Sequence, residues 1–405
     1  METKIESIPA GTITSPAGFR AGAVYAGIKK KAENALDLAI LHSTKPCVAA
    51  GVFTTNRIKA APVVLSQERL RSGKAAAVVA NSGCANACTG EPGFKDAEEM
   101  ARLAAERLGV PPELVVVAST GVIGQRLPMP LIRAGIKEIT LTGDGGHKFT
   151  RAIMTTDTVP KEIAVSATVG DTRFTIGGVA KGAGMIHPNM ATMLSFLTTD
   201  AAIELDFLKS ALKKAAALSF NMVSVDGDTS TNDTLLIMAN GLAGNRPIRH
   251  RSALAGIFQQ VLNQVCTYLA KAVARDGEGA TRLIEVTITG ALTAAQARQA
   301  ARTVVTSPLV KSAVHGNDPN WGRIVAAVGR SGIPVVEDKL DVYIGDICLL
   351  KAGQPLDFDE AEVIRTLKSP EVPVKVELNL GKGAATAWGC DLSEEYVTIN
   401  SQYTT

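Results

Sequence analysis

The chain has 405 residues, of which 46% are hydrophobic, and its 42 basic residues nearly balance its 39 acidic ones to give a net charge of +3. This near balance, together with an aromatic content of 4%, gives no reason to expect nucleic acid or an anionic membrane as a partner. At roughly 150 residues per domain, the length predicts two or three domains and allows a sizeable core.

The first half of the chain predicts buried strands interspersed with helices. Residues 96–108 carry apolar side chains at helical spacing, and Asp96 is the expected N-cap. Apolar runs typical of strands buried on both faces occur at 74–83, 113–121, 162–169, 171–180 and 193–197.

The second half continues this mixture and then changes in pattern. Apolar stripes predict helices at 206–220 and 253–277, the second stopped by Gly277, and a further helix is expected at 293–307. Strands are expected at 234–241, 282–290, 340–350, 372–381 and 395–400. The fold class is therefore predicted as α+β or layered α/β, with a larger domain at 1–280 and a smaller α+β domain at 281–405.

The six cysteines are scattered along the chain, which is typical of a protein that works in the reducing cytoplasm. Cys84 and Cys88 form the one close pair, and no second pair or nearby histidine completes a metal set, so a structural role is favoured over a zinc site. We expect no signal peptide and no transmembrane helix, because no basic start precedes an apolar stretch and no eighteen apolar residues are consecutive.

Common catalytic and ion-binding motifs are missing or incomplete. The sequence has no G-x-S-x-G, H-E-x-x-H or phosphate-loop motif, and its five histidines are isolated, so a histidine triad has no support from spacing. The acidic segment at 226–233 resembles a calcium loop, but Thr231 occupies the glycine position and Ile237 the twelfth, so an ordered turn is favoured.

The residues around Thr192 leave two interpretations open. Small Ala191 precedes it and an apolar run follows, and on its own this pattern favours an ordinary strand start. Alternatively, the Thr192 hydroxyl is aimed at its own preceding peptide bond. Without a histidine to activate a nucleophile, a threonine activated by its own α-amino group is the remaining route, which requires Thr192 to become a chain terminus.

Six segments spread over the chain resemble the ornithine acetyltransferase family, whose members are also called glutamate N-acetyltransferases or arginine-biosynthesis bifunctional proteins. These segments are TTDTVPK at 155–161, GGVAKGAGMIHPNMATMLSFLTTDA at 177–201, SVDGDTSTNDT at 224–234, DGEGATRL at 276–283, HGNDPNWGRI at 315–324 and INSQYTT at 399–405. The resemblance implies a four-layer αββα sandwich of the type found in self-cleaving aminopeptidases, plus a smaller C-terminal domain whose tail returns to the active site.

The resemblance also implies a precursor that cuts itself between Ala191 and Thr192 into an α chain, 1–191, and a β chain, 192–405. Thr192 is then the expected nucleophile, and Thr120 and Gly121 form the expected oxyanion hole. The residues expected to bind substrate are Thr155, Lys181, Thr192, Glu278, Asn400 and Thr405.

The implied reaction is a ping-pong transfer of the acetyl group from N-acetylornithine to glutamate, releasing ornithine and N-acetylglutamate. It needs no metal or redox cofactor, and the use of acetyl-CoA as a donor stays open. Family members pair their chains, so an α2β2 heterotetramer is expected, with no nucleic acid or membrane partner. Two alternatives remain: an aminopeptidase or amidase that passes the acyl group to water, and a non-enzymatic binding protein that needs no cut.

Overall fold

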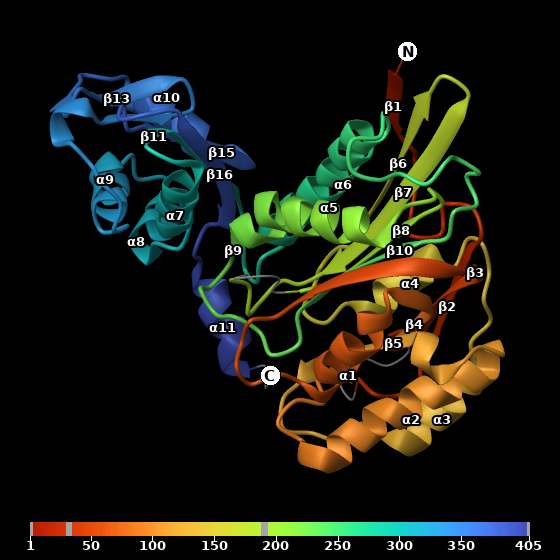
Figure 1. Cartoon of the computed structure of the whole chain (residues 1–405). Coiled ribbons are helices and arrows are strands. Elements are labelled where there is room, and N and C mark those ends of the chain that lie inside the picture. Colours follow the sequence, from red (N-terminus) through yellow and green to blue (C-terminus); the bar gives the residue numbers. More distant parts are fainter. Residues whose placement is uncertain (1–2, 30–34, 188–192, 403–405) are drawn as a thin grey trace.

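The computed structural model describes residues 3–29, 35–187 and 193–402, and their strands form two separate sheets (Figure 1). Within these residues, the first sheet has nine strands in the order β1-β6-β7-β8-β10-β3-β4-β5, with β2 paired to β3. The bounds are Thr3–Ser7 for β1, Phe19–Val24 for β2, Leu38–Phe53 for β3, Lys74–Cys84 for β4, Val115–Val122 for β5, Lys161–Val169 for β6, Thr172–Lys181 for β7, Leu194–Thr199 for β8 and Thr234–Ala239 for β10.

Strand β3 folds the first sheet over on itself. Its residues 38–42 pair with both β2 and β4, whereas residues 48–53 pair with β10, and its register to β4 shifts between His42 and Cys47. A bulge bends the strand in which it lies. This irregularity lets β3 belong to both halves of the sheet.

The two halves of this sheet pack face to face between two layers of helices. Apolar residues that alternate along the strands divide between the inner and outer faces, and the inner core includes Val78, Val179, Phe196 and Met238. Helices α5 (Leu205–Leu218) and α6 (Ala255–Arg275) cover one outer face, and α1 (Ala61–Arg69), α2 (Gly90–Leu108) and α3 (Met129–Glu138) cover the other. Helix α4 (Gly146–Ile153) contributes to the inner core. The two halves of the sheet with a helix layer on each outer face confirm the expected four-layer αββα arrangement (Figure 1).

The second sheet has the order β14-β13-β12-β15-β11-β16-β9 in the described part of the chain. Its strands are β9 (Val223–Ser224), β11 (Leu283–Ala291), β12 (Asp341–Ile344), β13 (Ile347–Lys351), β14 (Gln354–Pro355), β15 (Glu371–Glu377) and β16 (Gly383–Cys390). The later helices are α7 (Ala294–Val305), α8 (Pro308–Gly316), α9 (Trp321–Gly329), α10 (Glu360–Leu367) and α11 (Glu394–Gln402). Strand β9 joins this sheet from before the boundary predicted near residue 280, and α11 leads back toward the first sheet (Figure 1).

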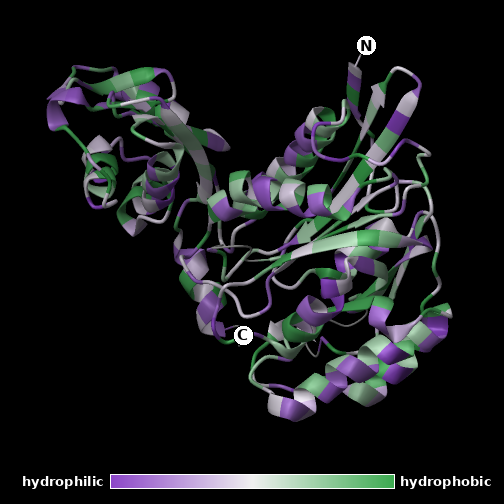
Figure 2. Ribbon diagram, in the orientation of Figure 1, coloured by the Kyte–Doolittle hydropathy of each residue, from purple (hydrophilic) through white to green (hydrophobic). Residues whose placement is uncertain are grey.

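Figure 2 shows the amphipathic pattern that these layers require, with hydrophilic and hydrophobic residues alternating around α2. In α2, Met100, Ala101 and Ala104 are buried, and the positions between them are more exposed. No helix in the described ranges is long and apolar enough to cross a membrane.

Two local predictions are wrong. Residues 395–400 were expected as a strand but lie in helix α11, which begins with Glu394 and Glu395, and acidic residues favour a helix N-terminus. The neighbouring strand β16 already has β11 and β9 on its two sides, so no sheet edge is free beside it. Asp96 is not an N-cap: it lies inside α2, where its carboxylate accepts two hydrogen bonds from Arg126 at 2.8 and 2.7 Å.

Candidate active site

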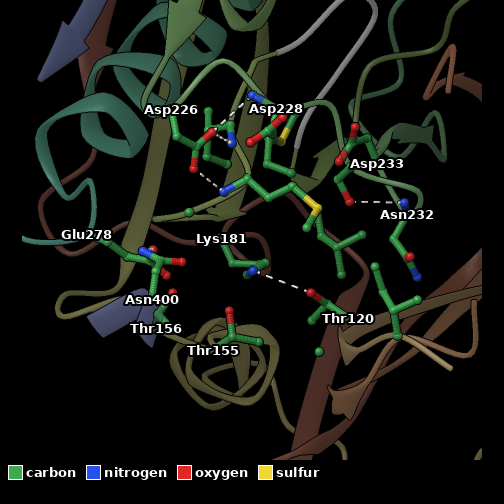
Figure 3. Close-up of a pocket in the computed structure, with 18 of the residues that line it drawn as sticks. Thr120, Thr155, Thr156, Lys181, Asp226, Asp228, Asn232, Asp233, Glu278 and Asn400 are labelled. Atoms are coloured by element: carbon green, nitrogen blue, oxygen red, sulfur yellow. Dashed lines mark hydrogen bonds between the residues drawn. The ribbon is translucent and has the colours of Figure 1, made fainter. Parts of the chain in front are cut away.

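A cavity of about 240 Å³ lies between the carboxyl end of β5, the end of β7, the start of β8 and helix α11 (Figure 3). It brings together every predicted site residue that the structure describes, namely Thr120, Gly121, Thr155, Lys181, Glu278 and Asn400. Ala191, Thr192 and Thr405, the predicted cleavage site, nucleophile and tail residue, lie outside the described residues.

Thr120 and Gly121 lie near the carboxyl end of β5, beside the parallel strand β4. The register pairs Ser82 with Thr120 and Gly83 with Gly121. Gly121 has a φ of +129°, and a Cβ there would lie 2.4 Å from the carbonyl carbon of Gly83, so this position requires glycine. Two strands therefore approach closely where the predicted oxyanion hole faces the cavity.

Lys181 is the last residue of β7 and pairs with Leu194 at the start of β8. Its side chain is largely buried, and its Nζ donates to the Thr120 hydroxyl at 3.4 Å (Figure 3). Burial lowers the pKa of Lys181, while the nearby carboxylate of Asp157 opposes this change. An ammonium group facing this cavity is suited to bind a carboxylate or to stabilise an oxyanion.

Asp157 fixes the loop that carries Thr155. Its Oδ2 accepts a hydrogen bond from Thr155 N at 2.9 Å, and its Oδ1 accepts from Gly182 N and Lys161 Nζ, both at 2.6 Å. Burial disfavours the ionised form of this carboxyl, yet the charges of Lys161 and Lys181 hold its pKa at about 2. Sequence reasoning missed Asp157, although it lies within the TTDTVPK segment.

Glu278 and Asn400 connect helix α11 to the cavity. Asn400 Nδ2 donates to Glu278 Oε2 at 2.8 Å, and Glu278 N donates to the carbonyl oxygen of Ala183 at 2.9 Å. A Cβ at Gly184 would lie 2.4 Å from the Glu278 carboxyl carbon, so glycine lets this carboxylate lie against the backbone. The C-terminal helix thus contributes a wall of the cavity.

The acidic segment at 226–233 forms the ordered turn that the sequence favours, and it fastens the chain ahead of the predicted cut. Asp226 accepts hydrogen bonds from Met185 N at 2.6 Å and from Ile186 N at 2.9 Å.

His187 contacts Ser224 Oγ through Nδ1 at 3.1 Å and Arg302 through Nε2 at 2.8 Å. Burial and the Arg302 charge lower the pKa of His187 to about 4, so this histidine is neutral at neutral pH.

Several further side chains that were not predicted as site residues also line the cavity, among them Thr156, Asp228, Ser230, Asn232, Asp233 and Tyr396. Most belong to the 226–233 turn, and its acidic composition was the available signal. Among the described residues, no group of three or more His, Cys, Asp or Glu side chains is arranged to hold a metal ion.

The chain matches the ArgJ family model over residues 20–405. The arginine biosynthesis bifunctional protein ArgJ of Dehalococcoides mccartyi (strain CBDB1) is 55% identical over 405 residues, which cover 100% of both chains. The protein of the same name from Symbiobacterium thermophilum is 54% identical over 398 residues, covering 98% of this chain and 99% of the relative. The crystal structure of the arginine biosynthesis bifunctional protein argJ from Bacillus halodurans is similar with a TM-score of 0.50 and 45% identity, covering 51% of this chain and 97% of that chain.

Proposed function

The chain belongs to the ArgJ family of arginine-biosynthesis acyltransferases, and we propose that it moves the acetyl group of N2-acetyl-L-ornithine to L-glutamate. The observation that carries this proposal is the convergence of Thr120, Lys181 and Glu278 on one cavity. Strand β8, which begins two residues after Thr192, starts at the same cavity.

Self-cleavage prepares the nucleophile. The Thr192 hydroxyl attacks the carbonyl carbon of Ala191, the acyl group shifts from nitrogen to oxygen, and water hydrolyses the ester. The cut leaves residues 1–191 and, by 405 − 191, a second chain of 214 residues. Two observations support this step. The Asp226 carboxylate accepts hydrogen bonds from the backbone N–H groups of Met185 and Ile186, and Arg302 bonds to His187, so residues 185–187 are held in place. In addition, 51% of this chain covers 97% of the Bacillus halodurans chain, which is therefore about half as long.

The freed α-amine of Thr192 serves as the base for its own hydroxyl. Its reference pKa is about 7.7–8.0, so a substantial fraction is neutral at neutral pH. Thr192 then takes the acetyl group from N-acetylornithine, ornithine leaves, and glutamate takes the acetyl group from the threonine ester. Thr120 and Gly121 stabilise the oxyanion of both tetrahedral intermediates.

The remaining cavity groups recognise the substrates. Lys181 binds the α-carboxylate that both substrates carry, and Glu278 binds the ornithine side-chain ammonium. Thr155, Asn400 and Thr405 complete the substrate site. The cycle has no step that requires a metal or a redox cofactor.

Ornithine release measured with and without glutamate tests the transfer reaction. We expect sustained release only when glutamate is present, with parallel double-reciprocal plots for the two substrates, as a ping-pong mechanism requires. Equal steady-state release without glutamate would instead identify the hydrolase alternative, in which water accepts the acetyl group.

Three wider features belong to the same proposal. Acetyl-CoA is the second acetyl donor to assay, because the relatives are named as bifunctional proteins. We also propose that the two cut chains assemble as an α2β2 heterotetramer and that the enzyme works in the cytoplasm.

A further inference from the structure

Asp233 is a buried carboxyl group in the cavity that the cycle above leaves without a role. It lies directly before β10, its residue is 1% exposed, and it lines the same cavity as Thr120 and Lys181 (Figure 3). Its Oδ2 is buried and has no hydrogen-bond partner. Because an unsatisfied buried oxygen is costly, such an atom calls for a ligand or a chemical role.

The other carboxyl groups of the described lining differ from Asp233. Both oxygens of Asp226 accept backbone N–H groups, and Glu278 accepts the amide of Asn400. Asp228 is exposed. Asp233 is thus the carboxyl group in this part of the structure that combines burial with an unpartnered oxygen.

The surroundings of Asp233 favour its protonated form. Burial raises its pKa well above the usual range, while hydroxyls of Ser230 and Thr54 and the charge of Lys181 oppose this change. Among the described residues, the titratable side chains that share the cavity with it are Lys181, Asp226, Asp228, Glu278 and Tyr396. A buried carboxyl group with a raised pKa can give its proton to a leaving group and later recover it.

We propose that Asp233 is a catalytic residue that protonates the departing amino nitrogen of ornithine and takes a proton from the incoming amino nitrogen of glutamate. This proposal rests on the proposed function.

The protons balance over the two half-reactions. When the acetyl C–N bond breaks, ornithine leaves as an ammonium ion with three protons on nitrogen: the amide hydrogen, the Thr192 hydroxyl proton relayed by the α-amine, and the Asp233 proton. The Asp233 carboxylate then takes one proton from the glutamate ammonium. The neutral amine attacks the threonine ester, and its second proton returns to the Thr192 oxygen by way of the α-amine.

The test compares two acetyl donors in single-turnover reactions of the wild type, Asp233→Asn and Asp171→Asn. N-acetylornithine has a leaving nitrogen that must be protonated, whereas p-nitrophenyl acetate releases a phenolate that needs no proton. For Asp233→Asn we expect acetylation of residue 192 by N-acetylornithine to be about 100-fold slower, with the p-nitrophenyl acetate rate within about threefold of wild type. Asp171→Asn removes an exposed carboxylate in the turn between β6 and β7, outside the cavity, and should leave the ratio of the two rates unchanged.

The outcomes distinguish failure of the Asp233 role from failure of the proposed function. Equal slowing with both donors, no slowing, or failure of Asp233→Asn to cut itself would overturn the role of Asp233. Absence of acetyl on residue 192 in the wild type with either donor would overturn the proposed function as well.

The pH dependence of the wild type gives a second test that needs no variant. The acetylation rate with N-acetylornithine should fall at high pH, where Asp233 loses its proton, relative to the rate with p-nitrophenyl acetate. A constant ratio across pH would also contradict the proposal.

Discussion

Asp157 shows how one buried side chain organises the residues around it. Its two oxygens accept hydrogen bonds from the backbone of Thr155 and Gly182 and from Lys161, which also donates to Asp276 at 2.5 Å. Lys161 is 2% exposed, so these charges are almost removed from water and depend on one another. The loop bearing Thr155 and the end of β7 bearing Lys181 are held by this network.

The depressed pKa of Asp157 predicts a specific pH dependence of stability. Because its folded-state pKa of about 2 lies below the unfolded value, its ionised form stabilises the fold above about pH 4, and this contribution is lost as pH falls toward 2. The difference in the free energy of unfolding between wild type and Asp157→Asn should shrink by about 2 kcal/mol between about pH 6 and pH 2. Urea unfolding across this range measures it, and a constant difference would contradict the assignment.

Thr120 offers a direct test of the oxyanion hole. Thr120→Val keeps the shape but removes the hydroxyl, and the loss of one such donor lowers kcat by roughly 100- to 1,000-fold. Thr120→Ser restores a hydroxyl and should recover much of that loss. Intact-mass spectrometry first shows which variants are cut. Steady-state kinetics of the cut variants then compares their kcat with that of the wild type. Near-wild-type kcat for Thr120→Val would remove this hydroxyl from the oxyanion hole.

Single residues were predictable from the sequence only where a motif marked them. Thr120, Lys181 and Glu278 come from the family resemblance, and the structure brings them to one cavity. Asp157 and Asp233 were missed because their importance comes from burial and from the partners they have or lack. Neither property is visible in the local sequence.

The secondary structure of helix α11 also depends on features that the local sequence does not show. The consecutive β-branched residues Val397, Thr398 and Ile399 favour a strand at 395–400. The adjacent sheet edge is occupied, however, and the segment forms a helix. Long periodic elements such as α5 and α6 were predicted well because one apolar stripe specifies each of them. The bend of β3, which joins the two halves of the first sheet, depends on pairing partners far away in the chain.

The position of α11 predicts a binding role for Asn400. Asn400→Ala removes the hydrogen bond to Glu278, a contact to a charged group, so KM for N-acetylornithine should rise about tenfold with a smaller effect on kcat. Thr398→Ala is the matched control, because its hydroxyl bonds only to the carbonyl of Glu394 within the same exposed helix. Equal KM values for both variants and the wild type would exclude Asn400 from the substrate site.

At the scale of the whole molecule, the proposed cut falls between strands of one sheet. Strand β8, after the cut, pairs with β7, before it, and β10 pairs with β3. The apolar core between the halves of the sheet also draws Val179 from one side of the cut and Phe196 from the other. The two chains therefore share hydrogen bonds and a core.

This arrangement predicts that the cut chains stay together. Residues 1–191 and 192–405 should elute as one species in size-exclusion chromatography without denaturant and should unfold in a single transition. They should separate only when urea disrupts the shared sheet. Dissociation under native conditions would contradict the continuous sheet across the cut.

Intact-mass spectrometry of the wild type beside Thr192→Ala tests most directly whether Thr192 becomes a chain terminus and then the nucleophile. We predict two wild-type chains that meet between Ala191 and Thr192, whereas the variant stays a single chain of 405 residues. Brief incubation with N-acetylornithine should then add one acetyl group to the wild-type chain that begins at Thr192. An active wild type that remains uncut would contradict the account, because Thr192 would have no free amine to activate it.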